Sequence, residues 1–388
     1  MIGWLSCGVS GLAALPVSGQ ERSETRPIDT FMRGFVEGRE IVGASLAISY
    51  GGRLVYARGF GYADRERGRV VQPETRFRIA SCSKPITAVT VLKLWEAGRL
   101  RLDESAFDLL GIVPHGGTPG DARLTRISVR HLLRHEGGWD RDRTYDPMFK
   151  TYWIGRQMGL GRPAEQREII QYMLSEPLQF APGSKYTYSN FGYQVLGRVI
   201  ERRSGKSYEE TVRRLILRPL GIDRMYIGHG PEERMARDEA RYYQVGRSGQ
   251  SPKAYKHRMQ VRDANGGWVA SAVELARFLT IFDTNPPVPL LSERSLELML
   301  ASRSKGGINL SHRGSLSDCC SSIMRRKQDG WSYVAFFNVY KDATGEKPTL
   351  DFDRELSRAV SKLEAWPTID LFPRRMRAKN VATRSKIY

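Results

Sequence analysis

The sequence predicts an α+β fold in which an antiparallel β-sheet, flanked by helices, is interrupted by an inserted all-helical domain. Strand-like segments occur in two groups that lie far apart in the chain, within residues 42–80 and within residues 308–339. Both groups consist of short apolar, β-branched and aromatic runs joined by tight turns, which is typical of antiparallel hairpins. Because the residues between them have mostly helical patterns, we expect one sheet whose halves are separated by a helical insertion.

The first group contains a predicted hairpin and a further strand. Residues 42–50 and 54–62 flank the turn Gly51-Gly52, and residues 75–80 continue the strand pattern. The next segment, 84–97, has apolar residues at helical spacing. Its proline lies in the first turn, where a missing N–H breaks no helical hydrogen bond. We therefore expect a helix directly after the strand at 75–80.

Capping signals and strand patterns locate the later elements. Ser128 can cap a short helix, and capping boxes open two further helices at Ser207 and Ser271. Strand patterns return at residues 308–312, 321–326 and 331–339. The expected organisation is a discontinuous α/β domain of residues 28–107 and 263–365, an all-helical insertion of residues 108–262, and a basic tail of residues 366–388.

The N-terminal residues 1–19 have features of a signal peptide. No charged side chain precedes Glu21, residues 9–17 are apolar and small, and Val17-Ser18-Gly19 would suit signal peptidase. We therefore expect an exported protein, periplasmic or extracellular. Because no Lys or Arg precedes the apolar residues, a cytoplasmic location stays an alternative.

The composition is that of a folded protein with a strongly basic surface. Apolar residues make up 40% of the 388 residues, which excludes wholesale disorder and collagen. Four cysteines are too few for a disulfide scaffold. The net charge is +19, so cell-envelope polyanions are candidate contacts of the basic surface. No nucleic-acid-binding motif is present, and we expect neither specific nucleic-acid binding nor a protein partner.

Ser81 and Lys84 are candidate catalytic residues. They lie three residues apart at the predicted strand-to-helix junction, so both side chains share one face of a helical turn. A serine hydroxyl becomes a good nucleophile only when a base takes its proton. Lysine can be that base only where burial or neighbouring positive charge lowers its pKa. Tyr188 could share this proton transfer with Lys84. The spacing alone leaves an alternative for Ser81, which could equally be a helix cap.

Three motifs, in this order, resemble those of the serine β-lactamase and penicillin-binding protein family. They are Ser81-Cys82-Ser83-Lys84, Tyr188-Ser189-Asn190 and His312-Arg313-Gly314. The second motif is similar to that of the branch that holds class C β-lactamases, D,D-carboxypeptidases and related esterases. The resemblance spans roughly residues 28–340 and implies a β-lactamase/transpeptidase-like fold.

Carried over to this sequence, the resemblance implies a serine hydrolase without cofactor or metal. Ser81 would be acylated, with Lys84 and Tyr188 as general base and acid. The implied substrate-binding residues are Asn190, His312, Gly314 and Ser315, and the N–H groups of Ser81 and Ser315 would bind the oxyanion. The implied substrate is a small molecule or a peptidoglycan-like peptide.

His312 stands where many members of the family have lysine. We expect its imidazolium to bind a substrate carboxylate, so that binding weakens as the pH rises through its titration. The implied activity is ester or amide hydrolysis of the D,D-carboxypeptidase or esterase kind. Hydrolysis of β-lactam antibiotics and non-catalytic binding of cell-envelope polymers are the alternatives.

Two further features remain open at this point. His131 and His135 lie four residues apart and could together bind a metal, although a structural role is expected. The charged loop 140–146 is either a rim of the active site or a solvated loop.

Overall fold

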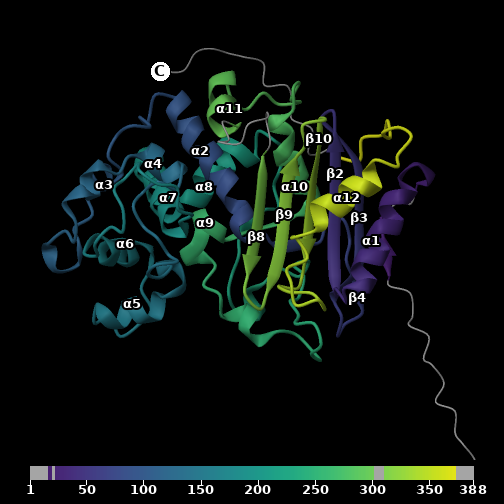
Figure 1. Ribbon diagram of the computed structural model, residues 1–388, viewed down its shortest axis with the longest axis horizontal. Coiled ribbons are helices and arrows are strands. Elements are labelled where there is room, and N and C mark those ends of the chain that lie inside the picture. The colour runs from purple at the N-terminus through teal and green to yellow at the C-terminus, as the bar shows by residue number, and fades with distance from the viewer. Residues whose placement is uncertain (1–15, 20–21, 301–309, 373–388) are drawn as a thin grey trace, which may run out of the picture.

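The computed structural model describes residues 16–19, 22–300 and 310–372, and its centre is a seven-stranded antiparallel sheet (Figure 1). The strand order is β1-β3-β2-β10-β9-β8, with β4 paired to β3. The strands are β1 Val17–Ser18, β2 Gly43–Tyr50, β3 Arg53–Asp64, β4 Arg69–Val70, β8 Ser311–Leu316, β9 Cys320–Arg326 and β10 Trp331–Phe337. β10 pairs with β2, so one sheet combines both ends of the chain, as the sequence predicts.

Helices cover both faces of this sheet. On one face lie α1 (Arg26–Gly38) and α12 (Phe352–Val360), whose buried side chains pack with those of β2, β3 and β10 (Figure 1). On the other face lies α10 (Ala272–Leu279), which contacts β2, β3 and β10. The buried residues of α10 and of α2 (Lys84–Glu96) belong to one large core with apolar side chains of this second face.

The inserted segment forms a helical region beside the edge strand β8 (Figure 1). Its helices are α3 Ala106–Leu110, α4 Val129–Leu133, α5 Thr151–Gln157, α6 Gln166–Leu174, α7 Asn190–Ser204 and α8 Tyr208–Val212, the last continuing into a π-helix, Arg213–Leu217. Two further helices are α9 Asp263–Gly266 and α11 Glu293–Leu300.

The final part of the predicted all-helical insertion differs from the expectation. Tyr226–Ile227 form β6, which pairs with β7 (Trp268–Ser271), and β7 pairs with β5 (Arg76–Arg78). These three strands make a second small sheet. Two-residue strands carry too little hydrophobic alternation to be detected from sequence. The domain bounds stay a prediction, but residues 108–262 are not all helical.

The predicted helix starts are present as hydrogen-bonded caps, and of the two predicted capping boxes the one at Ser271 is complete whereas Ser207 acts as a simple cap. The side chains of Ser128, Ser207 and Ser271 each accept a hydrogen bond from the backbone N–H three residues later. The hairpin turn Gly51-Gly52 is also confirmed, and both glycines have positive φ. The strand predicted at residues 308–312 is described from Leu310 onward, and β8 begins at Ser311.

The two chain ends are described only in part. Residues 1–15 of the predicted signal peptide lie outside the described residues, and Val17–Ser18 pair with β3. Residues 366–372, predicted to belong to the tail, pack on the sheet, because Trp366 stacks on Tyr50 at 4.9 Å. Residues 373–388 lie outside the described residues. No described helix combines the length and hydropathy that a membrane span requires.

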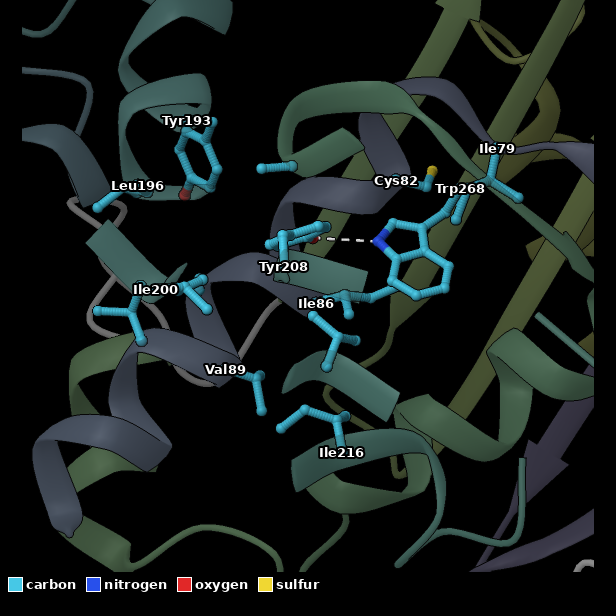
Figure 2. Close-up of a cluster of buried hydrophobic side chains, with 14 of the residues drawn as sticks. Ile79, Cys82, Ile86, Val89, Tyr193, Leu196, Ile200, Tyr208, Ile216 and Trp268 are labelled. Atoms are coloured by element: carbon cyan, nitrogen blue, oxygen red, sulfur yellow. Dashed lines mark hydrogen bonds between the residues drawn. The ribbon is translucent and has the colours of Figure 1, made fainter. Parts of the chain in front are cut away.

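A buried cluster fixes the position of α2 (Figure 2). Trp268 of β7 donates a 3.0 Å hydrogen bond from Nε1 to the hydroxyl of Tyr208. That hydroxyl lies 2.6 Å from Oγ1 of Thr87 on α2, and Thr87 also donates to the carbonyl of Ala264. Since all four polar groups are paired inside an apolar core, they fix the direction of α2 and hence the place of its first residues.

Candidate active site

Ser81 lies at the junction between β5 and α2, in a 3-10 turn formed by Ala80–Ser83. The preceding residue, Ala80, has φ +47, a left-handed conformation that is uncommon for a residue with a side chain. Hydrogen bonds hold the turn, from Cys82 N to Ile79 O at 3.1 Å and from Ser83 Oγ to Ala80 O at 2.7 Å. The turn leaves the Ser81 side chain partly exposed in a cavity of about 380 Å³.

Lys84 is the first residue of α2 and is fully buried. Its Nζ lies 3.1 Å from Ser81 Oγ, 2.7 Å from Asn190 Oδ1 and 2.6 Å from the carbonyl oxygen of Asn265. Burial lowers the Lys84 pKa to about 7, with Asp146 opposing the shift. Near neutral pH much of the Lys84 amine is therefore unprotonated and within reach of the Ser81 proton.

Tyr188 and Asn190 complete the surroundings of this amine. The Tyr188 ring centroid lies 4.9 Å from Lys84 Nζ. Burial raises the Tyr188 pKa well above its usual value, while its hydrogen bond with Ser81 acts in the opposite direction. Tyr188 is thus a neutral phenol that can donate a proton. Asn190 accepts from Lys84 and donates a 2.6 Å hydrogen bond to Asp146 Oδ2, which fixes its amide orientation.

β8 forms the wall opposite the helices. A side chain at Gly314 would overlap the carbonyl oxygen of Ile79 and Oγ of Ser322, and its Cβ would lie 3.0 Å from Ser81 N. Glycine therefore allows β8 to run directly beside the Ser81 turn. Ser315, the next residue, lines the same cavity. The arrangement is compatible with the expected oxyanion-binding role of the Ser81 and Ser315 N–H groups, which stays a prediction.

His312 differs from the expectation. Burial lowers its pKa to about 3, so the ring is neutral across the physiological range. This shift does not favour the predicted loss of carboxylate binding through His312 titration near neutral pH, and that loss stays a prediction. The ring lies 6.4 Å from the Tyr188 ring and lines a second cavity of about 280 Å³, together with apolar residues of α2 and α4.

His131 and His135 have the structural role that the sequence analysis expects. His131 Nδ1 accepts from the backbone N–H of Ser128 at 3.3 Å, which completes a capping box. His135 Nδ1 accepts from Ser189 N at 3.1 Å, and its ring packs on Tyr188 at 4.6 Å. Within residues 16–19, 22–300 and 310–372 there is no group of three or more His, Cys, Asp or Glu side chains placed to hold a metal.

Several residues that line or contact the candidate site were not singled out individually from the sequence. In the charged loop 140–146, Arg141 lies over the Tyr188 ring at 4.8 Å, and Asp146 binds Asn190. The loop is therefore a rim of the site, one of the two interpretations left open. Asn265 contributes its backbone carbonyl to Lys84, a role that no side-chain pattern could indicate. Arg262 also lines the cavity, although nothing in its sequence context marks it.

The comparisons with known proteins agree with this geometry. Residues 28–313 match the family described as Beta-lactamase. The chain is 35% identical over 207 residues to esterase EstB of Burkholderia gladioli, which covers 50% of this chain and 49% of that protein. It is 28% identical over 205 residues to penicillin-binding protein 4* of Bacillus subtilis (strain 168), covering 52% and 42%. The chain thus spans half or less of the length of these relatives.

Two solved structures share the fold. A penicillin-binding protein homologue from Pyrococcus abyssi, described as octameric, has a TM-score of 0.67 at 25% identity, covering 86% of this chain and 76% of that chain. The D-amino acid amidase of Ochrobactrum anthropi SV3 has a TM-score of 0.69 at 22% identity, covering 88% and 99%. These likenesses confirm the predicted fold class. Because the family match covers well over half of the residues and includes the Ser81, Lys84 and Tyr188 site, the chain belongs to the beta-lactamase family.

Proposed function

We propose that this protein hydrolyses small esters or amides through an acyl intermediate on Ser81. The observation that carries the proposal is the contact between Lys84 Nζ and Ser81 Oγ at 3.1 Å, with the amine buried and its pKa lowered to about 7. An amine in that state can accept a proton at neutral pH, which an ordinary surface lysine cannot do.

The proposed reaction has two steps. In the first, Ser81 Oγ attacks the substrate carbonyl carbon while its proton passes to Lys84 Nζ. Tyr188, hydrogen-bonded to Ser81, then gives its phenolic proton to the departing alcohol or amine and is reprotonated from Lys84. In the second step a water molecule attacks the acyl carbon, its proton passes to the same pair, and Ser81 regains its hydrogen. No cofactor is needed for this balance of protons.

The names of the relatives support an ester or amide substrate. One relative is named an esterase and one structural neighbour a D-amino acid amidase. Hydrolysis of β-lactams and non-catalytic binding of envelope polymers remain the competing hypotheses, and the basic surface of the chain suits the latter. Export from the cytoplasm also remains a prediction.

The test compares wild-type protein with Ser81→Ala and with Ser317→Ala. Ser317 is a matched control because it lines the same cavity. Substrates are p-nitrophenyl butyrate, a D-alanine amide, a D-alanyl-D-alanine peptide and nitrocefin, and a fluorophosphonate reports the nucleophile by mass spectrometry. Turnover and labelling that are lost in Ser81→Ala alone support the proposal. Labelling that survives in Ser81→Ala contradicts it, and rapid nitrocefin turnover alone would favour a lactamase.

A further inference from the structure

A patch of exposed aromatic side chains lies at the outer edge of the helical region. It consists of Phe149, Tyr152 and Trp153, which are 48%, 70% and 40% exposed. These are three of the four exposed aromatic side chains among the described residues. Two of them belong to α5, which lies on the opposite side of the molecule from α1 and α12 (Figure 1). Exposed apolar side chains that gather in one place mark a contact surface.

The chain around this aromatic patch carries positive charge and no acidic residue. Residues 147–164 contain Lys150, Arg156 and Arg162 but neither Asp nor Glu. Arg162 is already paired with Glu168 at 2.6 Å. Lys150 and Arg156 are exposed, and in the part of the chain that the structure describes no carboxylate oxygen lies within 4.0 Å of either. The aromatic patch is therefore accompanied by two cations that are available to a partner.

The aromatic patch has the features of side chains that lie between water and an apolar phase. The Trp153 ring contacts Tyr145 at 5.4 Å and Tyr172 at 5.6 Å, so its position is fixed before a partner binds. Neither the Trp153 indole N–H nor the Tyr152 hydroxyl has a hydrogen-bond partner among the described residues. Tryptophan and tyrosine, with an apolar ring and a polar atom that needs a partner, accumulate at the headgroup level of lipid bilayers.

Charge distinguishes a lipid surface from a second copy of this chain as the partner. The whole chain has a net charge of +19. A symmetric dimer through the aromatic patch would bring Lys150 and Arg156 of one copy close to the same cations of the other, and like charges repel. Anionic headgroups attract both side chains instead. Aromatic residues beside Lys and Arg are typical of segments that lie in a membrane interface.

We propose that the aromatic patch, together with Lys150 and Arg156, docks the protein onto the surface of an anionic lipid bilayer. The rings enter the headgroup region, and the two cations lie against the anionic phosphates. α5 has seven residues and packs on the protein through its other side, so the contact is peripheral and reversible. Phe149 also lines the catalytic cavity, so docking brings the mouth of that cavity to the lipid surface. The inference does not depend on the proposed hydrolase function.

The test measures the partition coefficient of the full-length protein on lipid vesicles by cosedimentation. One set of vesicles contains phosphatidylglycerol and phosphatidylcholine in equal parts, and the other contains phosphatidylcholine alone. Wild-type protein should bind the anionic vesicles at least tenfold more tightly, and added salt should weaken this binding. The double variant Tyr152→Ser/Trp153→Ser should lose at least tenfold in partition coefficient. Lys150→Gln/Arg156→Gln should lose a similar factor, since each cation near the surface contributes about fivefold.

Two control variants make matched changes away from the aromatic patch. Leu298→Ser removes an apolar side chain that is 40% exposed on α11, and it should bind as the wild type does. Arg358→Gln/Lys362→Gln removes two exposed cations at the end of α12, on the opposite side of the molecule (Figure 1). It should also keep wild-type binding. If Trp153→Ser lowers the thermal transition, Tyr152→Ser alone carries the test, because that side chain is 70% exposed.

A second measurement reports where the aromatic patch lies in the bilayer. Trp153 is the only exposed tryptophan among the described residues. Brominated phosphatidylcholine in the anionic vesicles should therefore quench part of the tryptophan fluorescence of the wild type. Trp153→Phe keeps an aromatic ring and should keep binding, but it should lose most of this quenching. Quenching that persists in Trp153→Phe would place another part of the chain in the bilayer and overturn the proposal.

The remaining outcomes also decide the proposal. Absence of wild-type binding, equal binding of both kinds of vesicle, or binding that neither patch variant weakens would overturn it. An equal loss in Arg358→Gln/Lys362→Gln would assign the binding to overall charge, with the same consequence. Dimerisation in analytical ultracentrifugation that Tyr152→Ser abolishes, without vesicle binding, would assign the aromatic patch to a second copy of the chain. Because none of these measurements follows turnover, their results are independent of the role of Ser81.

Discussion

The Asp146→Asn substitution should shift the pH dependence of acylation toward lower pH. Asp146 and Lys84 contact opposite ends of the Asn190 amide through hydrogen bonds of 2.6 and 2.7 Å. This places the two charges about 7 Å apart, and at an effective dielectric constant of about 20 they attract by about 2 kcal/mol. The attraction raises the Lys84 pKa against the effect of burial. Because one pKa unit corresponds to about 1.4 kcal/mol, removing the charge should lower the Lys84 pKa by about one to two units.

The assay is kcat/KM for a neutral p-nitrophenyl ester across pH, followed at the isosbestic wavelength of nitrophenol. This parameter reports the ionisation of the free enzyme. Wild-type activity should rise as the pH passes about 7, since only the unprotonated Lys84 amine accepts the Ser81 proton. In Asp146→Asn the same rise should occur at a pH lower by about one unit or more. The new side chain can still accept from Asn190 through its amide oxygen, which preserves the geometry.

Asp142→Asn provides the control for this shift. Asp142 belongs to the same loop, but its side chain is 86% exposed, so solvent screens its charge from Lys84. Its substitution should leave the rise in activity where it is in the wild type. An unchanged profile in Asp146→Asn, or a move toward higher pH, would refute the assignment of Lys84 as the titrating base. An equal shift in both variants would mean that overall charge controls the profile.

Three further predictions concern the other walls of the site. Tyr188→Phe should lower kcat/KM by about 10²- to 10⁴-fold, because the phenol that hydrogen-bonds Ser81 is lost, with an unchanged thermal transition as the check on folding. Gly314→Ala should reduce both esterase activity and stability, the latter by about 1–3 kcal/mol in urea unfolding, since the added methyl group would overlap the carbonyl oxygen of Ile79. His312→Gln should leave the shape of the pH–activity profile unchanged between about pH 5.5 and 8, because the ring is already neutral there; a lost inflection would contradict this.

The parts of the fold that the sequence predicts well are those with strong local signals. The capping serines, the Gly51-Gly52 hairpin and the helix after Ser81 depend on contacts within a few residues, and the structure confirms each. Four described α-helices that lie wholly outside residues 108–262 and away from the predicted starts were missed, namely α1, α9, α11 and α12. In α1 the buried Ile28, Met32 and Phe35 have helical spacing, so a usable pattern was present there.

The candidate site shows where local patterns fail. The sequence motifs contain the proposed nucleophile and its proposed base, because those residues are close together in the chain or belong to recognisable tripeptides. Folding of distant segments brings three further groups to the site, namely Asp146, Arg262 and the carbonyl of Asn265. These are ordinary charged or amide residues, so nothing in their local sequence indicates that they lie at the site. The lowered pKa of His312 has the same origin, since it follows from the desolvation of the ring in the folded chain. An imidazole's surroundings cannot be inferred from a single motif.

The role proposed for Lys84 as a base depends on which atoms accept hydrogen bonds from its amine. All three acceptors within hydrogen-bond distance of its amine are neutral oxygens, supplied by the hydroxyl of Ser81, the amide of Asn190 and the carbonyl of Asn265. Neutral acceptors satisfy the donors of a buried amine without stabilising its charge as strongly as a carboxylate would, so burial can lower the pKa. The acceptors come from the Ser81 turn, α7 and α9, which only the folded chain brings together. The reactivity that we propose for Ser81 therefore depends on how these three sequence-distant segments pack around the Lys84 amine.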